Sequence, residues 1–325
     1  MVSPNTVFSE LVATTLNQHR KDVADNISKG NALLARLMEK GRYETVDGGQ
    51  QIVEPLDYTE NSSYQRYSGY DRLNISPTSV LSAAQYDWKQ CSVHITASGL
   101  ELRQNAGKNQ LIRLAEARIA NALRTFKNKL SEDVYSDGSA DQGKQISGLQ
   151  AVVSDSGRGT VGGINSEEFA FWRNKVQSAA APMQGGNAVE VSKETIKQLM
   201  NPLYLDLCRG NNRPDLIVSS NDYFSFYWES LQDLQRYADD TGATAGFQSL
   251  KYVTADVIHD GGSGIPDGHM YFLNTEYLKL VVHQDANMTQ MAEKSILDQD
   301  AVVIPLLWMG NLVCSNRALQ GVLKS

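Results

Sequence analysis

Residues 41–88 have the sequence GRYETVDGGQQIVEPLDYTENSSYQRYSGYDRLNISPTSVLSAAQYDW, which is rich in tyrosine and poor in aliphatic side chains. This stretch contains no phenylalanine and six of the chain's 14 tyrosines, namely Tyr43, Tyr58, Tyr64, Tyr67, Tyr70 and Tyr86. Gly48-Gly49 marks a turn between two extended runs. Ordering such a segment costs about 1 to 2 kcal/mol of backbone entropy per residue, and an isolated two-stranded ribbon is barely stable in water. The segment therefore needs a surface to pack against.

The chemistry of tyrosine indicates what kind of surface this is. Its side chain offers a large amphipathic contact area at low entropic cost, and it is enriched at protein interfaces. We expect residues 42–88 to form an arm that lies on another copy of the protein, with Tyr58, Tyr64, Tyr67 and Tyr70 in the contact. Composition leaves one alternative open, an ordinary hairpin that folds back on its own domain.

Length, charge and cysteine content limit the class of protein. A chain of 325 residues exceeds the usual size of one core, so we expect one large irregular domain or two interleaved ones. No apolar run approaches the roughly 18 to 20 residues that span a bilayer, and residues 1–20 do not resemble a secretion signal. The net charge of −7 argues against a dedicated nucleic-acid binder. Cys91, Cys208 and Cys314 are too few and too far apart for a disulfide framework or a thiolate zinc cluster, so we expect a reducing compartment.

The N-terminus is predicted to be helical. Ser3-Pro4 is a helix start, and Gly30 ends the pattern. Asn31 can cap a second short helix that stops at Gly41. Between Ser3 and Gly30 the apolar residues form one narrow stripe: Phe8, Leu11, Val12, Leu16, Val23 and Ile27. This stripe docks either on its own core or on a neighbouring subunit, and in the second case Phe8 and Leu11 are contact candidates.

Periodicity predicts the elements that follow the arm. Residues 91–97 alternate as in a half-buried strand, and a second extended piece runs from Gly99 to Asn105. Residues 109–133 form the clearest helix, a rod of nearly 40 Å at about 1.5 Å per residue. We expect mixed α/β structure after that: helices from Ser192 to Cys208 and from Asn221, and strand-like pieces at 216–218, 250–258, 270–273, 278–282 and 301–307.

Three features have part of the pattern of a chemical site, and none has all of it. Gly138 to Lys144 has the spacing of a phosphate-binding loop, but Gln145 replaces the required hydroxyl and the segment does not join a strand to a helix. The Gly-rich stretch from Gly157 to Gly163 lacks the helix and the acidic residue of a dinucleotide site. Two histidines and three carboxylates could bind a divalent metal, but they surround an ordinary Gly-rich turn: Asp256, His259, Asp260, Asp267 and His269. We therefore expect no catalytic, cofactor or metal site.

The 109–133 helix has a basic face that leaves two interpretations open. It carries Arg113, Arg118, Arg124, Lys127 and Lys129, diluted by Glu116, Glu132 and Asp133. A charged helix face is usually only solvated, and the alternative is contact with nucleic acid.

Four blocks of the sequence resemble tailed-bacteriophage major capsid proteins. The run from Val161 to Asn174, with its Gly-Gly-Ile-Asn and Trp-Arg-Asn parts, is similar to a block of that family. The other blocks are Thr45-Val-Asp-Gly-Gly with Ile52-Val-Glu-Pro55 and Tyr67-Ser-Gly-Tyr70; Arg213-Pro-Asp-Leu-Ile-Val-Ser-Ser-Asn-Asp-Tyr223 with Gln235-Arg-Tyr237; and Phe272-Leu-Asn-Thr275 with Gln299-Asp-Ala301 and Gly310-Asn-Leu312. They follow in the family's order and together cover nearly the whole chain.

The resemblance implies an α+β protein with the fold of tailed-phage and herpesvirus capsids. Residues 1–41 would be the N-terminal arm, 42–88 the E-loop that overlaps a neighbour, and 89–150 the peripheral domain with its spine helix, completed by about 270–305. Residues 151–269 would be the axial domain, completed by about 306–325. Subunits of this family gather around the axial domain into pentamers and hexamers.

The implied function is that of a non-catalytic major capsid protein, assembled in the host cytoplasm and found in the virion. It would form an icosahedral head around double-stranded DNA without sequence-specific binding or a membrane. Its partners would be further copies, a portal, a decoration protein and a separate scaffolding protein, the last because no long scaffold-like extension precedes the arm. No lysine lies between Lys40 and Lys89, so the E-loop lacks the lysine that self-crosslinking members use, and we expect a shell without covalent crosslinks. The alternatives are a nanocompartment shell of the same fold around an enzyme cargo, and a soluble α/β enzyme that uses metal or nucleotide at the sites weighed above.

Overall fold

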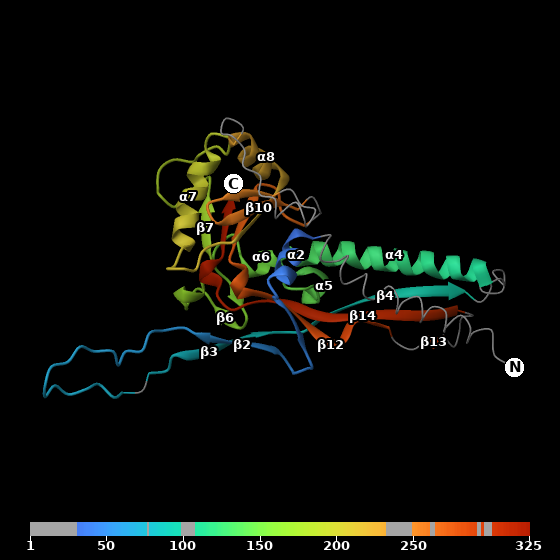
Figure 1. The fold of residues 1–325 in the computed structure, drawn as a ribbon, viewed down its shortest axis with the longest axis horizontal. Coiled ribbons are helices and arrows are strands. Elements are labelled where there is room, and N and C mark those ends of the chain that lie inside the picture. The colour runs from blue at the N-terminus through green and yellow to red at the C-terminus, as the bar shows by residue number, and fades with distance from the viewer. Residues whose placement is uncertain are drawn as a thin grey trace.

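The computed structural model describes residues 31–76, 78–98, 108–231, 249–260, 264–290, 294–295 and 301–325. It is an elongated α+β molecule, which confirms the predicted class (Figure 1). A six-stranded sheet with two helices lies at one side, a long helix runs along a five-stranded sheet, and a thin arm extends in the opposite direction from that helix (Figure 1). The helix predicted from Ser3 and the extended piece from Gly99 to Asn105 lie outside the described residues.

Helix α2 (Ala32–Glu39) forms as its sequence predicts. The side chain of Asn31 caps it by accepting a hydrogen bond of 3.0 Å from the backbone nitrogen of Leu34. Its apolar face is buried in the main core, and the chain leaves the helix through Gly41, which has a φ of +67°.

The five-stranded sheet carries the long helix. Its strands are β1 (Tyr43–Val46), β12 (Leu278–Gln290), β14 (Ala301–Cys314), β13 (Lys294–Ser295) and β4 (Lys89–Ser98). The order is β1-β12-β14-β13, with β4 antiparallel to β14, and β1 runs parallel to β12. Helix α4 (Lys108–Val134) lies along β4 (Figure 1). In β4, Cys91, Val93 and Ile95 point inward, as the alternation predicts.

The six-stranded sheet has the order β7-β15-β11-β8-β10-β9. Its strands are β7 (Lys175–Ser178), β15 (Gly321–Lys324), β11 (His269–Leu273), β8 (Leu216–Ser219), β10 (Ala255–His259) and β9 (Ser249–Tyr252). Helices α7 (Ile196–Leu207) and α8 (Asn221–Ser230) cover one face through Ile217 and its neighbours. The other face, with Leu216 and Val218, packs on the core that α2 and α4 share. The two sheets are therefore joined by one continuous core.

Several element boundaries differ from the predicted ones. Strands β12 and β14 run beyond 278–282 and 301–307, because the outer part of β12 is bulged and partly exposed and Gly310 interrupts the apolar pattern of β14. The piece predicted at 250–258 is a hairpin, whose turn contains Val253 at a φ of +54° and so gives no glycine signal. Helix α7 starts at Ile196 because Ser192 and Thr195 form a hydrogen-bonded turn before it.

Short elements complete the chain. They are α5 (Ala140–Gly143), α6 (Leu149–Val152), β5 (Thr160–Val161), β6 (Ile164–Asn165) and the 3-10 turns Ala170–Trp172, Thr275–Tyr277 and Arg317–Leu319. The chain crosses between the two sheets at 274–277 and again at 315–320. The segment boundaries implied by the resemblance stay a prediction. Among the described residues, no helix is long and apolar enough to cross a membrane.

Candidate assembly surfaces

A two-stranded hairpin forms the root of the arm. Strand β2 (Ile52–Asp57) pairs antiparallel with β3 (Leu81–Tyr86), and residues 58–80 continue away from both sheets (Figure 1). Its inner face is buried against Trp172, Val281 and Val313, with which these arm residues pack: Ile52, Leu56, Ala84 and Tyr86. The root is thus a hairpin folded on its own domain, whereas the tip is not.

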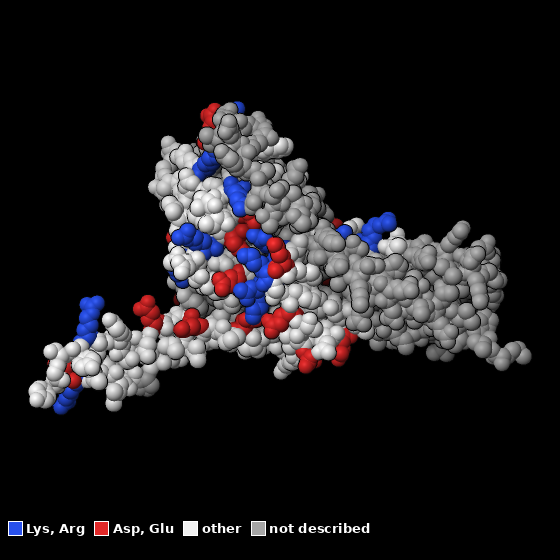
Figure 2. Space-filling view, viewed as in Figure 1, with Lys and Arg blue, Asp and Glu red and all other residues white. Residues whose placement is uncertain are grey.

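The tip exposes three of the tyrosines that the sequence singled out. Tyr64, Tyr67 and Tyr70 have exposed fractions of 79%, 65% and 106%, and Leu73 and Ile75 are exposed as well. Figure 2 shows that most of the arm's visible surface is uncharged. Large apolar side chains that remain in water on a thin arm are typical of a surface that a partner covers.

The other three tyrosines of the segment contact the protein's own fold. Tyr43 packs against the main core. The hydroxyl of Tyr86 donates a hydrogen bond of 2.8 Å to the carbonyl oxygen of Cys314, and burial raises the pKa of Tyr86. The ring of Tyr58 lies 5.7 Å from that of Phe171. Phe8 and Leu11 lie outside the described residues, and contact of the six candidate residues with a neighbour stays a prediction.

A glycine turn holds the arm root by backbone contact. Gly162 joins β5 to β6 with a φ of +60°, and its carbonyl oxygen accepts a hydrogen bond of 2.9 Å from the backbone nitrogen of Gln85. A Cβ atom at Gly162 would lie 2.8 Å from the Cβ of Ala84. Only glycine fits this approach between the turn and β3.

The rest of the 161–174 block is organised by its polar side chains. The indole nitrogen of Trp172 donates to the carbonyl oxygen of Val161 at 2.9 Å, and the Trp172 side chain is buried beneath the arm root. Arg173 donates from Nε to the carbonyl oxygen of Ser166 at 2.7 Å. Trp172 and Arg173 therefore hold this block together next to the arm.

Asn174 continues this block into a buried network with Arg317. The Arg317 side chain is 0% exposed. It donates from Nη2 to Oδ1 of Asn174 at 2.9 Å and from Nε to the carbonyl oxygen of Val152 at 2.6 Å. Burial lowers the pKa of Arg317. A buried cation needs such acceptors, so this network fixes the second crossing between the sheets onto α6 and β7.

A lysine of the central sheet pairs with the arm root. Nζ of Lys279 on β12 lies 3.2 Å from both carboxylate oxygens of Glu54 on β2 and 3.4 Å from Glu44 on β1. Glu54 is buried, and Lys279 provides a cation beside its carboxylate. Three strands thus meet at one ammonium group.

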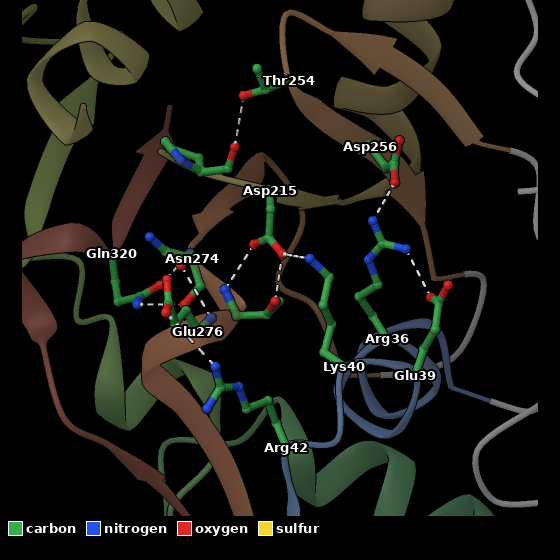
Figure 3. Close-up of polar contacts among 12 residues, drawn as sticks. Arg36, Glu39, Lys40, Arg42, Asp215, Thr254, Asp256, Asn274, Glu276 and Gln320 are labelled. Atoms are coloured by element: carbon green, nitrogen blue, oxygen red, sulfur yellow. Dashed lines mark hydrogen bonds and ion pairs between the residues drawn. The ribbon is translucent and has the colours of Figure 1, made fainter. Parts of the chain in front are cut away.

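Helix α2 and the residues after it are paired with the six-stranded sheet (Figure 3). Arg36 contacts Asp256 at 2.6 Å, and Lys40 contacts Asp215 at 3.1 Å. Asp215 also accepts 2.8 Å and 2.5 Å hydrogen bonds from the backbone nitrogen and hydroxyl of Thr275. These contacts fix the direction in which the chain enters the arm, next to the first crossing between the sheets.

The structure gives the residues of the candidate chemical sites ordinary roles. The segment from Gly138 to Lys144 follows helix α4 and contains left-handed residues, so it does not join a strand to a helix. Among the described residues, no group of three side chains could hold a metal. Asp256 pairs with Arg36, Asp260 accepts a hydrogen bond from the Tyr135 hydroxyl at 2.7 Å, and His269 contacts Asp155 at 3.0 Å.

The basic face of α4 is partly used within the chain. Arg118 donates to the carbonyl oxygen of Thr96, and Lys129 pairs with Glu132 at 2.7 Å. Arg124 is exposed. The part of this face that the structure describes therefore has the features of a solvated helix surface, and contact with nucleic acid is untested.

Solved structures with the same arrangement of elements are capsid proteins. A chain of the cyanophage A-1(L) capsid asymmetric unit matches with a TM-score of 0.62 and 17% identity, over 88% of this chain and 91% of that one. The capsid of an empty GTA particle matches with a TM-score of 0.54 and 12% identity, over 88% of each chain. The capsid of Myoviridae phage XM1 matches with a TM-score of 0.53 and 11% identity, over 89% and 91%. This chain has the tailed-phage capsid fold.

The tailed-phage capsid fold of this chain is shown by structural similarity and not by sequence similarity. No protein-family model matches the chain, and no curated protein matches it. The resemblance seen in four short blocks is confirmed by structures that match most of the chain at 11 to 17% identity. Identities this low show the fold alone. Any assembly has to be inferred from the chain's own surfaces.

Sequence reasoning did not predict the residues that hold the arm root and the second crossing between the sheets. The contacts of Gly162, Asn174 and Arg317 are with residues far away in the chain. The sequence around Lys279 does not indicate that it pairs with Glu54. The glycine pair between Val161 and Ile164 was the available signal for the turn.

Proposed function

We propose that this chain is the major capsid protein of a tailed bacteriophage. It assembles without catalysis into an icosahedral head of pentamers and hexamers that encloses double-stranded DNA, and no covalent crosslinks join its subunits. The structural matches to phage capsids support the class of function. A separate scaffolding protein, a portal and a decoration protein belong to the same proposal.

The observation that carries the proposal is the exposed arm tip. Tyr64, Tyr67 and Tyr70 lie in water on a segment with no core of its own, and the tip points away from its own chain (Figure 1). A protomer alone gains nothing from such a surface, because ordering it costs entropy and its apolar area stays solvated. Burial of the tip on a neighbouring protomer provides the missing stabilisation.

Electron microscopy of the purified full-length chain tests this proposal. Closed shells of uniform size support it, and a monomer at every concentration contradicts it. The content of particles from the native source separates the phage head from a nanocompartment, since double-stranded DNA supports the first and an enzyme cargo the second. Turnover of nucleotide, or bound metal in a stoichiometric amount, would instead indicate an enzyme.

A further inference from the structure

The arm tip has two limbs, one that leads outward from Tyr58 to about Ser68 and one that returns from about Asp71 to Val80. Side chains join the two limbs. The last backbone hydrogen bond that connects them is that from Tyr58 to the carbonyl oxygen of Val80, at 3.1 Å. In the described residues 59–76 and 78–79, the other backbone pairs are local turns, at Asn61 to Tyr64 and Ser68 to Asp71. The ladder of β2 and β3 therefore stops, while the arm continues.

Gln65 replaces the ladder at the point where the tyrosines lie. Its Nε2 donates to the carbonyl oxygen of Arg72 at 2.9 Å, and its Oε1 accepts from the backbone nitrogen of Asn74 at 3.1 Å. A residue of a parallel strand makes the same two bonds, one to each side of the residue opposite. The amide of Gln65 thus holds residues 72–74 as a neighbouring strand would.

Further side chains complete this bracing. The hydroxyls of Ser62 and Thr78 lie 2.7 Å apart across the two limbs. Oδ1 of Asn74 accepts from the backbone nitrogen of Ser76 at 3.0 Å, and Oδ2 of Asp71 accepts from that of Ser68 at 2.9 Å. All these bonds are exposed to water, where each contributes little to the stability of a protomer.

We propose that Gln65 is a positioning residue of the assembly contact, which holds the two limbs of the arm tip in the shape that binds a second copy of this chain. The inference rests on the proposed function and adds to it a device that prepares the contact before assembly. Preorganisation raises affinity because the entropy of ordering is lost before binding. Gln65 lies between Tyr64 and Tyr67, and its partners Arg72 and Asn74 flank the exposed Leu73.

The chemistry of the tip favours a second copy as the partner. Residues 58–80 carry two acidic side chains, Glu60 and Asp71, and two basic ones, Arg66 and Arg72, so the tip has no net charge. A neutral, tyrosine-rich surface suits a protein partner and gives no attraction to the phosphates of nucleic acid. The tip also points away from the rest of the described structure, which leaves it open to another molecule (Figure 1).

Two measurements on the full-length chain test the role of Gln65. The first is hydrogen exchange at the backbone amide of Asn74 in protomers held below the concentration at which particles form. The second is the protomer concentration at which particles first appear in light scattering. The variants are Gln65→Ala, which removes both bonds, and Gln65→Glu, which keeps the size of the side chain but removes the donor. Ser79→Ala is the control, because Ser79 is exposed on the same arm and the described structure gives it no bond between the limbs.

We expect Gln65→Ala to speed exchange at Asn74 and to raise the particle-forming concentration by about tenfold, which corresponds to 1.4 kcal/mol. Gln65→Glu should lie between Gln65→Ala and the wild type in both measurements, and Ser79→Ala should match the wild type. Unchanged exchange in Gln65→Ala would overturn the bracing. Faster exchange with an unchanged threshold would overturn its role in assembly. If the wild-type chain formed no particles, the proposed function itself would fail, and exchange at Asn74 would still report whether Gln65 holds the tip.

Discussion

Lys279 on β12 places its Nζ 3.2 Å from both carboxylate oxygens of Glu54 on β2, so that an ion pair joins the five-stranded sheet to the root of the arm. Glu54 is buried, and Lys279 is the one cation that pairs with it among the described residues, so removal of Lys279 would take that counter-charge away from a buried carboxylate. The arm root therefore depends on a residue more than 200 positions away in the sequence.

Lys279→Met should lower the free energy of unfolding of the protomer by about 2 kcal/mol, less than for a fully buried pair because Lys279 is partly exposed. Urea denaturation of the soluble protomer measures this change. The double variant Lys279→Met/Glu54→Leu should recover most of the loss, because it removes both charges. A double variant that is less stable than Lys279→Met would show that Glu54 has another partner.

Gly162→Ala should destabilise the protomer by about 2 kcal/mol and loosen the arm root. The methyl group would lie 2.8 Å from the Cβ of Ala84, and the φ of +60° disfavours any side chain. Gly163→Ala is a matched control, since Gly163 has a φ of +76° in the same turn and nothing within 4 Å of the added atom. Equal melting temperatures for the two variants would mean that the approach to Ala84 is unimportant.

Sequence analysis predicted the elements whose signals are local. The cap at Asn31, the alternation of β4 and the long helix α4 are set by neighbouring residues, and each is confirmed. The exposure of Tyr64, Tyr67 and Tyr70 agrees with the expectation from composition. These features require no knowledge of distant parts of the chain.

The remaining features depend on contacts between distant segments. Strands β7 and β15 are four residues each and gain their stability from neighbours in the six-stranded sheet. Arg317 is a charged residue in the core, which periodicity assigns to the surface, and only its acceptors at Val152 and Asn174 explain its burial. The contact between Gly162 and the arm root also depends on a distant residue, because it is the position of Ala84 that requires glycine there.

Replacement of Tyr64, Tyr67 and Tyr70 by serine should weaken assembly by several kcal/mol per subunit, at about 25 cal/mol for each Å² of apolar area that stays solvated. The melting temperature of the protomer should hardly change, because all three side chains are exposed. Tyr86→Phe should instead lower the stability of the protomer, because Tyr86 is buried in its own chain. It removes the hydrogen bond to Cys314 and should cost the protomer about 1 to 3 kcal/mol. A large loss of protomer stability in the triple variant, with normal particles, would reverse the assignment.

Deletion of residues 1–29 should leave a soluble protomer that fails to form correct shells. Asn31 remains as the cap of α2, and the buried face of α2 is kept. Deletion of residues 1–41 provides the contrast, since it removes Leu33, Leu34 and Leu37 from the core and should abolish folding. Circular dichroism and electron microscopy distinguish the two results. Insoluble product from the shorter deletion would show that the first helix belongs to the core.

Mature particles should contain no covalent links between subunits. A link between an arm lysine and a neighbour requires an amine at the tip, and no lysine lies between Lys40 and Lys89. Both of these lysines lie outside the β2–β3 hairpin and have partners elsewhere: Lys40 pairs with Asp215 at 3.1 Å, and Lys89 donates to the carbonyl oxygen of Gly143.

The arginines of the arm and two of the cysteines do not replace that amine. The arginines of the arm remain protonated, and burial raises the pKa of Cys91 and of Cys314 to about 12, so both thiols stay neutral. Stability must then come from overlap of the arm with a neighbour and from ion pairs that are individually weak. Particles boiled in detergent with reductant should therefore give one band near 35.8 kDa. A ladder of multimers that survives this treatment would contradict the prediction and would identify Lys40 or Lys89 as the residue to replace first.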